Sequence, residues 1–391
     1  MNLSNENRLL ILCARNGITG DKPEEINSLL SLRIKWDEFL NNAVSQGIAP
    51  LVYKSLKDIP EKACVPEEVM NKLKIAYHGN VARNMYLYSE LERILQVLNG
   101  KEIEVMILKG AALADAVYGD IGLRVMGDID LLVKEECLPR VMEIMSDLNY
   151  ETQRHCKPEE WYSTNHFHLP PFIHKEKSIV VEIHWKVAQD SLGIDVDKWW
   201  GRARNIRLGE TSVLIPSPED MILHICLNLY HGSYQRAVLR GLCDIAETLR
   251  YFSKEINRDE FYDIVRQSEI DRPVYSLLFL VRKYFDGSNQ LLPRLEAGHA
   301  DLKFSAILER IIFGPWNVSH SVFMRTLSAE TKWEKAKMVF TDIFPSQEKM
   351  SERYSIHPGS LKVYFYYAYR PFELIVKYGR SLLDVIRFNH S

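Results

Sequence analysis

The chain has 391 residues, of which 46% are hydrophobic and 26% are charged. This length exceeds what one hydrophobic core usually supports, so we expect a globular protein built from two or three packed units. The 49 Lys and Arg residues nearly balance the 52 Asp and Glu residues, which leaves a net charge of -3. Because the chain has no net positive field, its composition argues against a long nucleic-acid substrate.

The N-terminal sequence and the cysteine spacing bear on the cellular compartment of the protein. The first ten residues, MNLSNENRLL, lack the basic start and apolar run of a signal peptide. No stretch of the sequence reaches the roughly 18 apolar residues of a membrane helix. The six cysteines are widely spaced, without a Cys-x-x-Cys pair, which favours reduced thiols over a disulfide framework or a zinc knuckle. We therefore expect a cytoplasmic protein without a transmembrane segment.

Residues 1–99 predict a helical N-terminal region. Trp36, Leu40 and Val44 recur at a spacing of four, as expected for one face of a helix. A second apolar stripe occupies residues 87–98 and ends at Asn99-Gly100, a sequence typical of a helix C-terminus.

Residues 100–215 change character, because short β-rich segments now alternate with helical ones. Strands are predicted at 104–108 and 128–133, followed by a helix at 138–148. Further strands are predicted at 166–173, 179–187 and 213–215. Two prolines inside the first of these favour an edge strand or a bend.

Residues 216–391 predict a helical C-terminal domain. Ser217 is followed by Pro218 and two acids, the pattern of a capped helix start. The aromatic segment 363–369 precedes several basic residues; we interpret it as core packing rather than a membrane-surface helix. The predicted fold is therefore α+β, with a small mixed β-sheet core at 100–215 between helical regions at 1–99 and 216–391.

The most informative stretch lies at residues 107–133. Asp128 and Asp130 are separated by Ile129, so on a strand both carboxylates would project from one face and Ile129 from the other. Two adjacent carboxylates repel each other, and a cation between them relieves this repulsion. Magnesium is the natural candidate, because one or two carboxylates commonly hold it together with substrate phosphates.

A third acid and a phosphate-binding turn complete the predicted site. Glu182 interrupts the apolar strand VVEIHWKV, where His184 would share its face. A third carboxylate is needed if two metal ions are to serve one transfer reaction. Lys109, Gly110 and Ala111 stand between a predicted strand and a predicted helix, where backbone amides and the helix dipole favour a phosphate.

The segments LKGAAL, RVMGDIDLLV and VEIHW together resemble the core of nucleotidyltransferases of the DNA polymerase beta superfamily, and most closely a bacterial group of uncharacterised nucleotidyltransferases. The resemblance covers about residues 80–250. It implies that Asp128, Asp130 and Glu182 hold Mg²⁺ or Mn²⁺ and that Gly110 is the phosphate-loop glycine. Arg124 matches a basic position often found ahead of the acidic pair.

The sequence departs from the superfamily pattern at the phosphate loop. Ala111 replaces the usual serine, and Gly110 precedes Asp128 by 18 residues, a longer spacing than the broad pattern. Lys109 and Arg124 are therefore the candidate side chains for the phosphates, and His184 is a candidate contact for the substrate. Asp244, on a predicted helix, is a further candidate base.

The predicted reaction is Mg-dependent transfer of a nucleotidyl group from an NTP to a hydroxyl-type acceptor on a small molecule or protein. One alternative is a glycosyltransferase that binds a nucleotide sugar through manganese at Asp128 and Asp130. Another is a nucleotide-binding relic without catalysis. His166 and His168 raise the separate possibility of zinc, but no ligand spacing supports it. The sequence leaves the nucleotide, the acceptor and the oligomeric state open.

Overall fold

The computed structural model describes most of the chain. The described residues are 3–17, 22–59, 64–152, 166–189, 192–231, 237–285, 302–313, 333, 340–341, 343–354, 356–357 and 359–389. The following statements concern these residues.

Five helices precede the sheet, as the apolar periodicity predicted. They are α1 (Asn5–Cys13), α2 (Lys22–Leu30), α3 (Trp36–Ser45), α4 (Ala49–Lys57) and the 33-residue α5 (Glu67–Asn99). In α3 the core-facing residues include Phe39, Leu40 and Ala43, whereas Val44 is 62% exposed. The buried face of α3 therefore follows the three- and four-residue spacing of a helix rather than the strict spacing of four in the predicted row.

Seven strands form one mixed sheet in the order β3-β4-β5-β2-β1-β7-β6. Their bounds are β1 (Met106–Ile107), β2 (Ile129–Leu132), β3 (Tyr150–Thr152), β4 (Phe172–His174), β5 (Val180–His184), β6 (Arg204–Leu208) and β7 (Thr211–Ile215). The central strand β2 runs antiparallel to β1 and parallel to β5. All four of its residues are buried, as expected for a strand covered on both faces.

The sheet differs in detail from the predicted one. It is larger than the small sheet expected, because β3 and β6 add strands at its two edges. The predicted strand at 166–173 is confined to β4 and an isolated bridge between His168 and His184. Pro170 and Pro171 lie between these two pairings, where a proline cannot donate a ladder hydrogen bond.

Short helices connect the strands. Helix α6 (Lys109–Ala116) follows β1, the 3₁₀ turn η2 (Glu135–Cys137) and α7 (Leu138–Asp147) follow β2, and α9 (Asp197–Arg202) precedes β6. Helix α7 matches the helix predicted at 138–148.

Helices then follow to the end of the described chain. They are α10 (Pro218–His231), α11 (Val238–Tyr251), α12 (Arg258–Gln267), α13 (Asp271–Tyr284), α14 (Leu302–Phe313), α17 (Gln347–Arg353) and α18 (Lys362–Asn389). The predicted cap of α10 is present, because the Ser217 hydroxyl accepts a hydrogen bond from the Asp220 amide at 3.2 Å.

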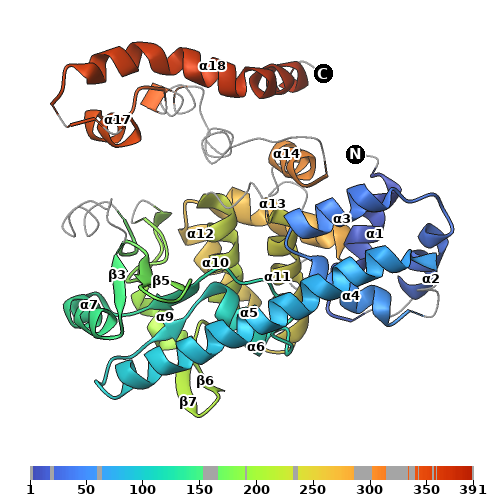
Figure 1. Ribbon diagram of the computed structural model, residues 1–391, viewed down its shortest axis with the longest axis horizontal. Helices are drawn as coiled ribbons and strands as arrows, with labels where there is room; N and C mark the ends of the chain where they lie inside the picture. The colour runs from blue at the N-terminus through green and yellow to red at the C-terminus, as the bar shows by residue number, and fades with distance from the viewer. Residues whose placement is uncertain are drawn as a thin grey trace.

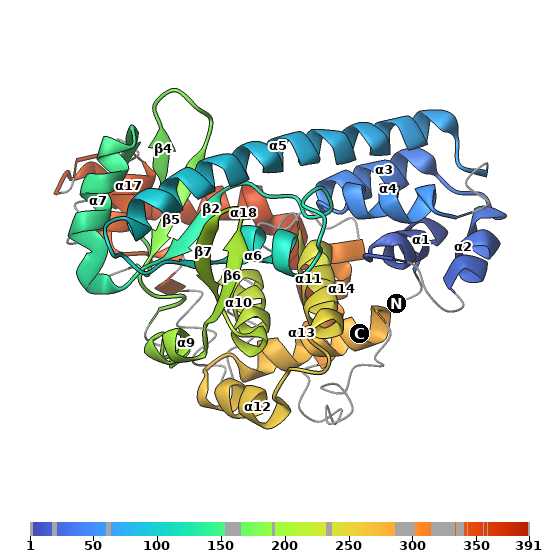
Figure 2. The same ribbon diagram turned by 90° about the horizontal axis from the view of Figure 1, so that it is seen from below.

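The helices lie on both sides of the sheet. Figure 2 shows α5 running along one side, with α10, α12 and α13 on the opposite side. Helix α6 packs against β2 and α10, and it thereby connects the sheet to the C-terminal helices. The α+β fold class is confirmed. The division into three domains at 99 and 215 stays a prediction.

The aromatic segment of the C-terminal helix contradicts our interpretation of it as core. Tyr364, Phe365 and Tyr369 on α18 are between 48% and 68% exposed, although Val363 is fully buried. Figure 1 shows α18 alongside α17 and above α14. Aromatic composition alone did not indicate which face of this helix would be covered.

The cysteines and the helix lengths bear on two further expectations. The five described cysteines are free, and Cys156 lies outside the described residues. None of the helices in the described ranges combines the length and the apolar character needed to cross a membrane.

Candidate active site

The register between β2 and β5 brings two predicted acids together. The strands are parallel, and Asp130 pairs with Glu182 while Leu132 pairs with His184. Residues paired across adjacent strands project from the same face of the sheet. The sheet therefore places the Asp130 and Glu182 side chains next to each other, with His184 two residues further along.

Lys109 and His184 contact both carboxylates. The Lys109 ammonium lies 2.5 Å from Oδ1 of Asp130 and 3.5 Å from Oε2 of Glu182. His184 Nε2 lies 3.1 Å from the same Asp130 oxygen and 3.5 Å from the same Glu182 oxygen. Since a carboxylate only accepts, we assign the proton of His184 to Nε2. Its Nδ1 is buried without a partner among the described residues, which suits an unprotonated nitrogen.

These contacts favour the ionised form of both acids. Burial by itself would raise the pKa of Asp130, but the Lys109 charge and the hydrogen bond from His184 hold it well below its usual value. The hydrogen bond from His184 also lowers the pKa of Glu182, against the effect of burial. For Lys109, burial opposes the charge, yet the two carboxylates raise its pKa above the usual value.

Asp128 differs from its neighbours. It immediately precedes β2, and it is partly exposed, whereas Asp130 is 2% exposed. Burial, followed by the negative charge of Asp130, raises the pKa of Asp128 to about 6. A positive charge in addition to those of Lys109 and Arg124 would therefore stabilise the ionised form of Asp128.

The predicted strand-to-helix turn is present at Lys109. Strand β1 ends at Ile107 and α6 begins at Lys109, whose φ of 46° is in the left-handed region. A Cβ atom at Gly110 would lie 2.9 Å from Met126 Cγ and 3.1 Å from Arg124 Nη1. A side chain at position 110 would therefore force Met126 or Arg124 to shift. Ala111 is buried, so its side chain is part of the packing.

Arg124 is bound to a residue far along the chain. Its Nε lies 3.2 Å and 3.1 Å from the two carboxylate oxygens of Asp244 on α11, and its Nη2 lies 2.8 Å from Oδ2. The Tyr118 hydroxyl donates to the same carboxylate at 2.9 Å. Asp244 is 2% exposed, so this buried group joins the segment before β2 to the C-terminal helices.

A cavity of about 430 Å³ lies in front of the acids. Asp128, Glu182 and His184 line it, together with Lys109 and Gly110 from the turn. Helices α10 and α11 contribute to the same cavity through His224, Asn228 and Arg240. Volumes of this size are typical of small-molecule sites. The cavity therefore combines a group of carboxylates with cationic and amide side chains from another part of the chain.

The model of a family described as uncharacterised nucleotidyltransferases matches residues 33–286, well over half of the chain. The chain belongs to this nucleotidyltransferase family. Neither the curated proteins nor the solved structures give a significant match. The family match begins within the N-terminal helices and ends after α13, so it includes every residue of the cavity described above.

Family membership supports nucleotidyltransferase activity for this chain. It favours nucleotidyl transfer over the glycosyltransferase alternative. The donor atoms of Asp130, Glu182 and His184 lie within 4.8 Å of one another, a grouping compatible with a metal ion. Asp128 is not part of this group; it lies in the bend that precedes the strand.

The structure places several of the other predicted residues around this cavity. His168 lines the cavity, and its ring centroid lies 5.2 Å from that of His184. The metal-compatible group in the described residues contains His184 but neither His166 nor His168, so it gives no support to the zinc alternative. Asp244 is bound by Arg124 and Tyr118 rather than presented to the substrate as a base.

Arg240, His224 and Asn228 were not predicted from the sequence. The sequence pattern of α10 and α11 indicates only which face of each helix is apolar and buried. No motif distinguishes these three residues from other polar residues of the two helices. Their relevance becomes visible only in the folded structure, where they line the same cavity as Asp128 and Glu182.

Proposed function

We propose that the chain transfers a nucleotidyl group from an NTP, with Mg²⁺ or Mn²⁺, to a hydroxyl-type acceptor on a small molecule or protein. The observation that carries this proposal is the pairing of Asp130 with Glu182 across β2 and β5, beside a cavity that Asp128 also lines. Family membership indicates the reaction class, and the three acids are the proposed metal ligands.

The donor set fits a divalent cation. Asp130 and Glu182 offer carboxylate oxygens within 4.8 Å of each other, and His184 belongs to the same group. Oxygen ligands suit both Mg²⁺ and Mn²⁺. His184 Nε2 donates to Asp130 and is not a ligand in this proposal. In the proposal Asp128, Asp130 and Glu182 would hold the metal ion, and a bound ion would supply charge neutralisation at the phosphates and activation of the acceptor hydroxyl.

The protein groups supply position and charge. The first amides of α6 are available to the phosphates, because the first turn of a helix has no intrahelical acceptors. Lys109 would reach the phosphates once a metal ion replaces its contacts with Asp130 and Glu182. His184 fixes the Asp130 carboxylate through its 3.1 Å contact. Arg124 contributes its charge while Asp244 fixes its orientation. Preorganised charges of this kind stabilise a phosphoryl-transfer transition state.

The proposal includes three further assignments. Membership of the DNA polymerase beta superfamily is supported by the Asp-Ile-Asp strand, the acid on the neighbouring strand and the strand-to-helix turn at Lys109. The division at residues 99 and 215 and the cytoplasmic location remain predictions. The net charge of -3 continues to argue against a long nucleic-acid substrate.

A labelling experiment tests the reaction class. The full chain is incubated with Mn²⁺, a pool of small-molecule and protein acceptors, and an NTP labelled at either the α- or the γ-phosphate. The proposal predicts that the α-label appears on an acceptor and that the γ-label is released as pyrophosphate. Transfer of the γ-label to an acceptor, or sugar transfer from a nucleotide sugar without pyrophosphate release, would contradict it.

A further inference from the structure

Arg240 is a cationic residue of the cavity without a carboxylate ion-pair partner among the described residues. It lies near the start of α11 and lines the same 430 Å³ cavity as Asp128 and Glu182. Its Nη1 donates a long hydrogen bond, of 3.5 Å, to the carbonyl oxygen of Val125. By contrast, neighbouring Arg124 has its guanidinium bound to Asp244.

The surroundings of Arg240 disfavour its charge. Burial, and then the nearby Arg124 charge, lower its pKa to about 10. The guanidinium is partly exposed, and the charges of Asp244 and Asp128 offset its burial and the Arg124 charge only in part. An additional anion would therefore stabilise it. Such a residue persists most readily where a ligand provides the missing negative charge.

The backbone makes room for this guanidinium. Gly47, between α3 and α4, has a φ of 66°, and a Cβ atom there would lie 2.9 Å from Arg240 Nη1. The side chain therefore passes between the N-terminal helices and the segment before β2. Its position is set by packing from three parts of the chain, as expected for a preorganised binding group.

Asn228 extends the same wall. It lies on α10 and, like Arg240, lines both the main cavity and a smaller cavity beside it. An amide N–H and a guanidinium are both donors for phosphate oxygens. Asp128 and Glu182 line the same cavity and would repel an anion that lacks a metal ion.

We propose that Arg240, assisted by Asn228, binds the polyphosphate of the NTP in the cavity that the carboxylates also line. This inference rests on the proposed function and adds to it a residue of α11 that receives the phosphates. A bidentate arrangement is not required, because a single charge-assisted contact already contributes to phosphate affinity.

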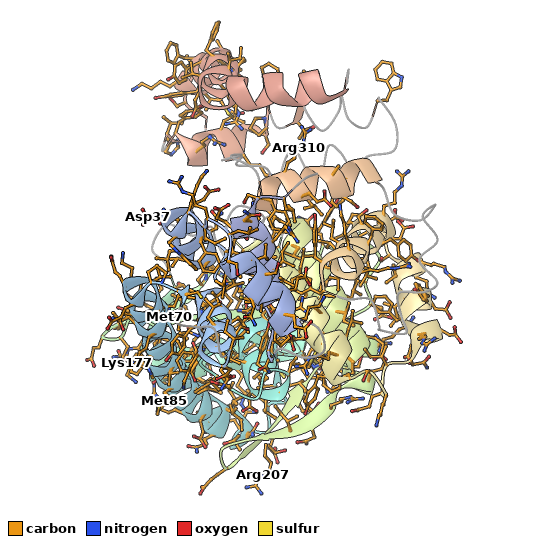
Figure 3. All side chains as sticks on the ribbon, turned by 90° about the vertical axis from the view of Figure 1, so that its right-hand side faces the viewer. Asp37, Met70, Met85, Lys177, Arg207 and Arg310 are labelled. Carbon is orange, nitrogen blue, oxygen red and sulfur yellow. The ribbon has the colours of Figure 1, made fainter. Side chains whose placement is uncertain are left out.

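Binding of two probes to the full chain tests the inference. Calorimetry measures Mn²⁺ alone, and then inorganic tripolyphosphate in the presence of Mn²⁺, for the parent, Arg240→Gln and Arg240→Lys. Arg207→Gln is the matched control, since Arg207 lies on the β6–β7 hairpin and points away from the body in Figure 3.

We expect Arg240→Gln to weaken tripolyphosphate binding roughly ten- to a hundredfold, the scale of one lost hydrogen bond to a charged group. Arg240→Lys should retain part of the affinity, and Arg207→Gln should retain all of it. Binding of Mn²⁺ alone should not weaken in any of these variants. The melting temperature of ligand-free Arg240→Gln should stay the same or rise, because a charge that its surroundings disfavour is removed.

The outcomes distinguish the two proposals. If the parent binds Mn²⁺ and tripolyphosphate and Arg240→Gln binds both equally well, the inference fails and the proposed function stands. A variant that melts much earlier or does not fold would make Arg240 a structural residue and would also overturn the inference. If the parent binds neither probe, the proposed function itself fails.

Discussion

Lys109 and Asp130 form an ion pair in which the ammonium nitrogen lies 2.5 Å from the carboxylate oxygen Oδ1. The same nitrogen lies 3.5 Å from Glu182, so one cationic side chain contacts two of the three proposed metal ligands. A metal ion that binds these oxygens must compete with Lys109 for them. Once the metal ion is bound, the Lys109 ammonium group can turn toward the phosphates. Lys109 would then affect both metal binding and nucleotide binding.

Replacement of Lys109 should therefore separate metal binding from nucleotide binding. We expect Lys109→Met to bind Mn²⁺ alone more tightly, on the order of tenfold or more, because a competing positive charge is removed. Affinity for the NTP should fall, because the phosphates lose a cation. Calorimetry with each ligand measures both effects, and Lys134→Met is the control, since Lys134 forms an exposed ion pair with Glu104. Weaker binding of Mn²⁺ alone would refute the competition.

The Arg124–Asp244 pair should contribute strongly to stability. Asp244→Ala leaves a buried guanidinium without its carboxylate, which we expect to lower the free energy of unfolding by about 3–5 kcal/mol. Urea denaturation measures this change. The control is Lys198→Ala, because both partners of the Lys198–Asp195 ion pair are more than half exposed; its effect should stay below about 1 kcal/mol. A similar small loss for Asp244→Ala would show that this pair does not hold the segment before β2.

Glu90 should give the fold a pH-dependent contribution. Its carboxylate, on α5, accepts hydrogen bonds from Arg93 and Tyr150 and from Lys177 at 2.5 Å. Burial alone would raise its pKa, but the bonds from Arg93 and Lys177 lower it below the usual value. A lowered carboxyl pKa stabilises the fold above the unfolded value of 4.5, and this stability is lost as the pH falls through the folded pKa.

Glu90→Gln should consequently be less stable than the parent by about 1–3 kcal/mol near pH 7. The difference should shrink once the pH drops below about 4.5. Melting temperatures measured from pH 3 to pH 7 test this, with Glu143→Gln, at an exposed position on α7, as the control. A difference that grows toward acid pH would be inconsistent with the lowered pKa.

Glu182→Gln separates an active transferase from a nucleotide-binding relic. The substitution keeps the shape of the side chain but removes one charge from the proposed metal site. We expect NTP binding to remain largely intact while pyrophosphate release, with an acceptor present, falls on the order of a hundredfold or more. Unchanged pyrophosphate release would remove Glu182 from the reaction, and loss of binding alone would assign it to nucleotide affinity.

The sequence predicted those parts of the site that depend on local periodicity. The two-residue spacing of Asp128 and Asp130 located the strand, and Ser217 located the start of α10. The strand β6 was missed because RNIRL is mostly polar, although Gly209 and Glu210 between β6 and β7 match a two-residue hairpin turn. Edge strands carry a weaker apolar signal than central ones, which explains the difference.

The long-range contacts could not be predicted in this way. Arg124 and Asp244 are separated by 120 residues, and no local pattern specifies which buried groups will meet across such a distance. The same holds for Arg240, whose relation to the cavity depends on how α11 packs against the sheet. Register was an intermediate case: the pattern placed Glu182 on a strand, but only the pairing of β2 with β5 brought it beside Asp130.

Coupled binding of metal and NTP to the parent, Asp128→Asn and Asp130→Asn tests the proposed metal site most directly. Titration calorimetry would measure NTP affinity with and without Mn²⁺, and Asp147→Asn, at an exposed position on α7, serves as the control. We predict metal-dependent NTP binding in the parent and the control, and loss of the metal dependence in both site variants, because each loses a charge that holds the ion. Metal-dependent NTP binding that is as tight in both site variants as in the parent would contradict the assignment of these acids as metal ligands.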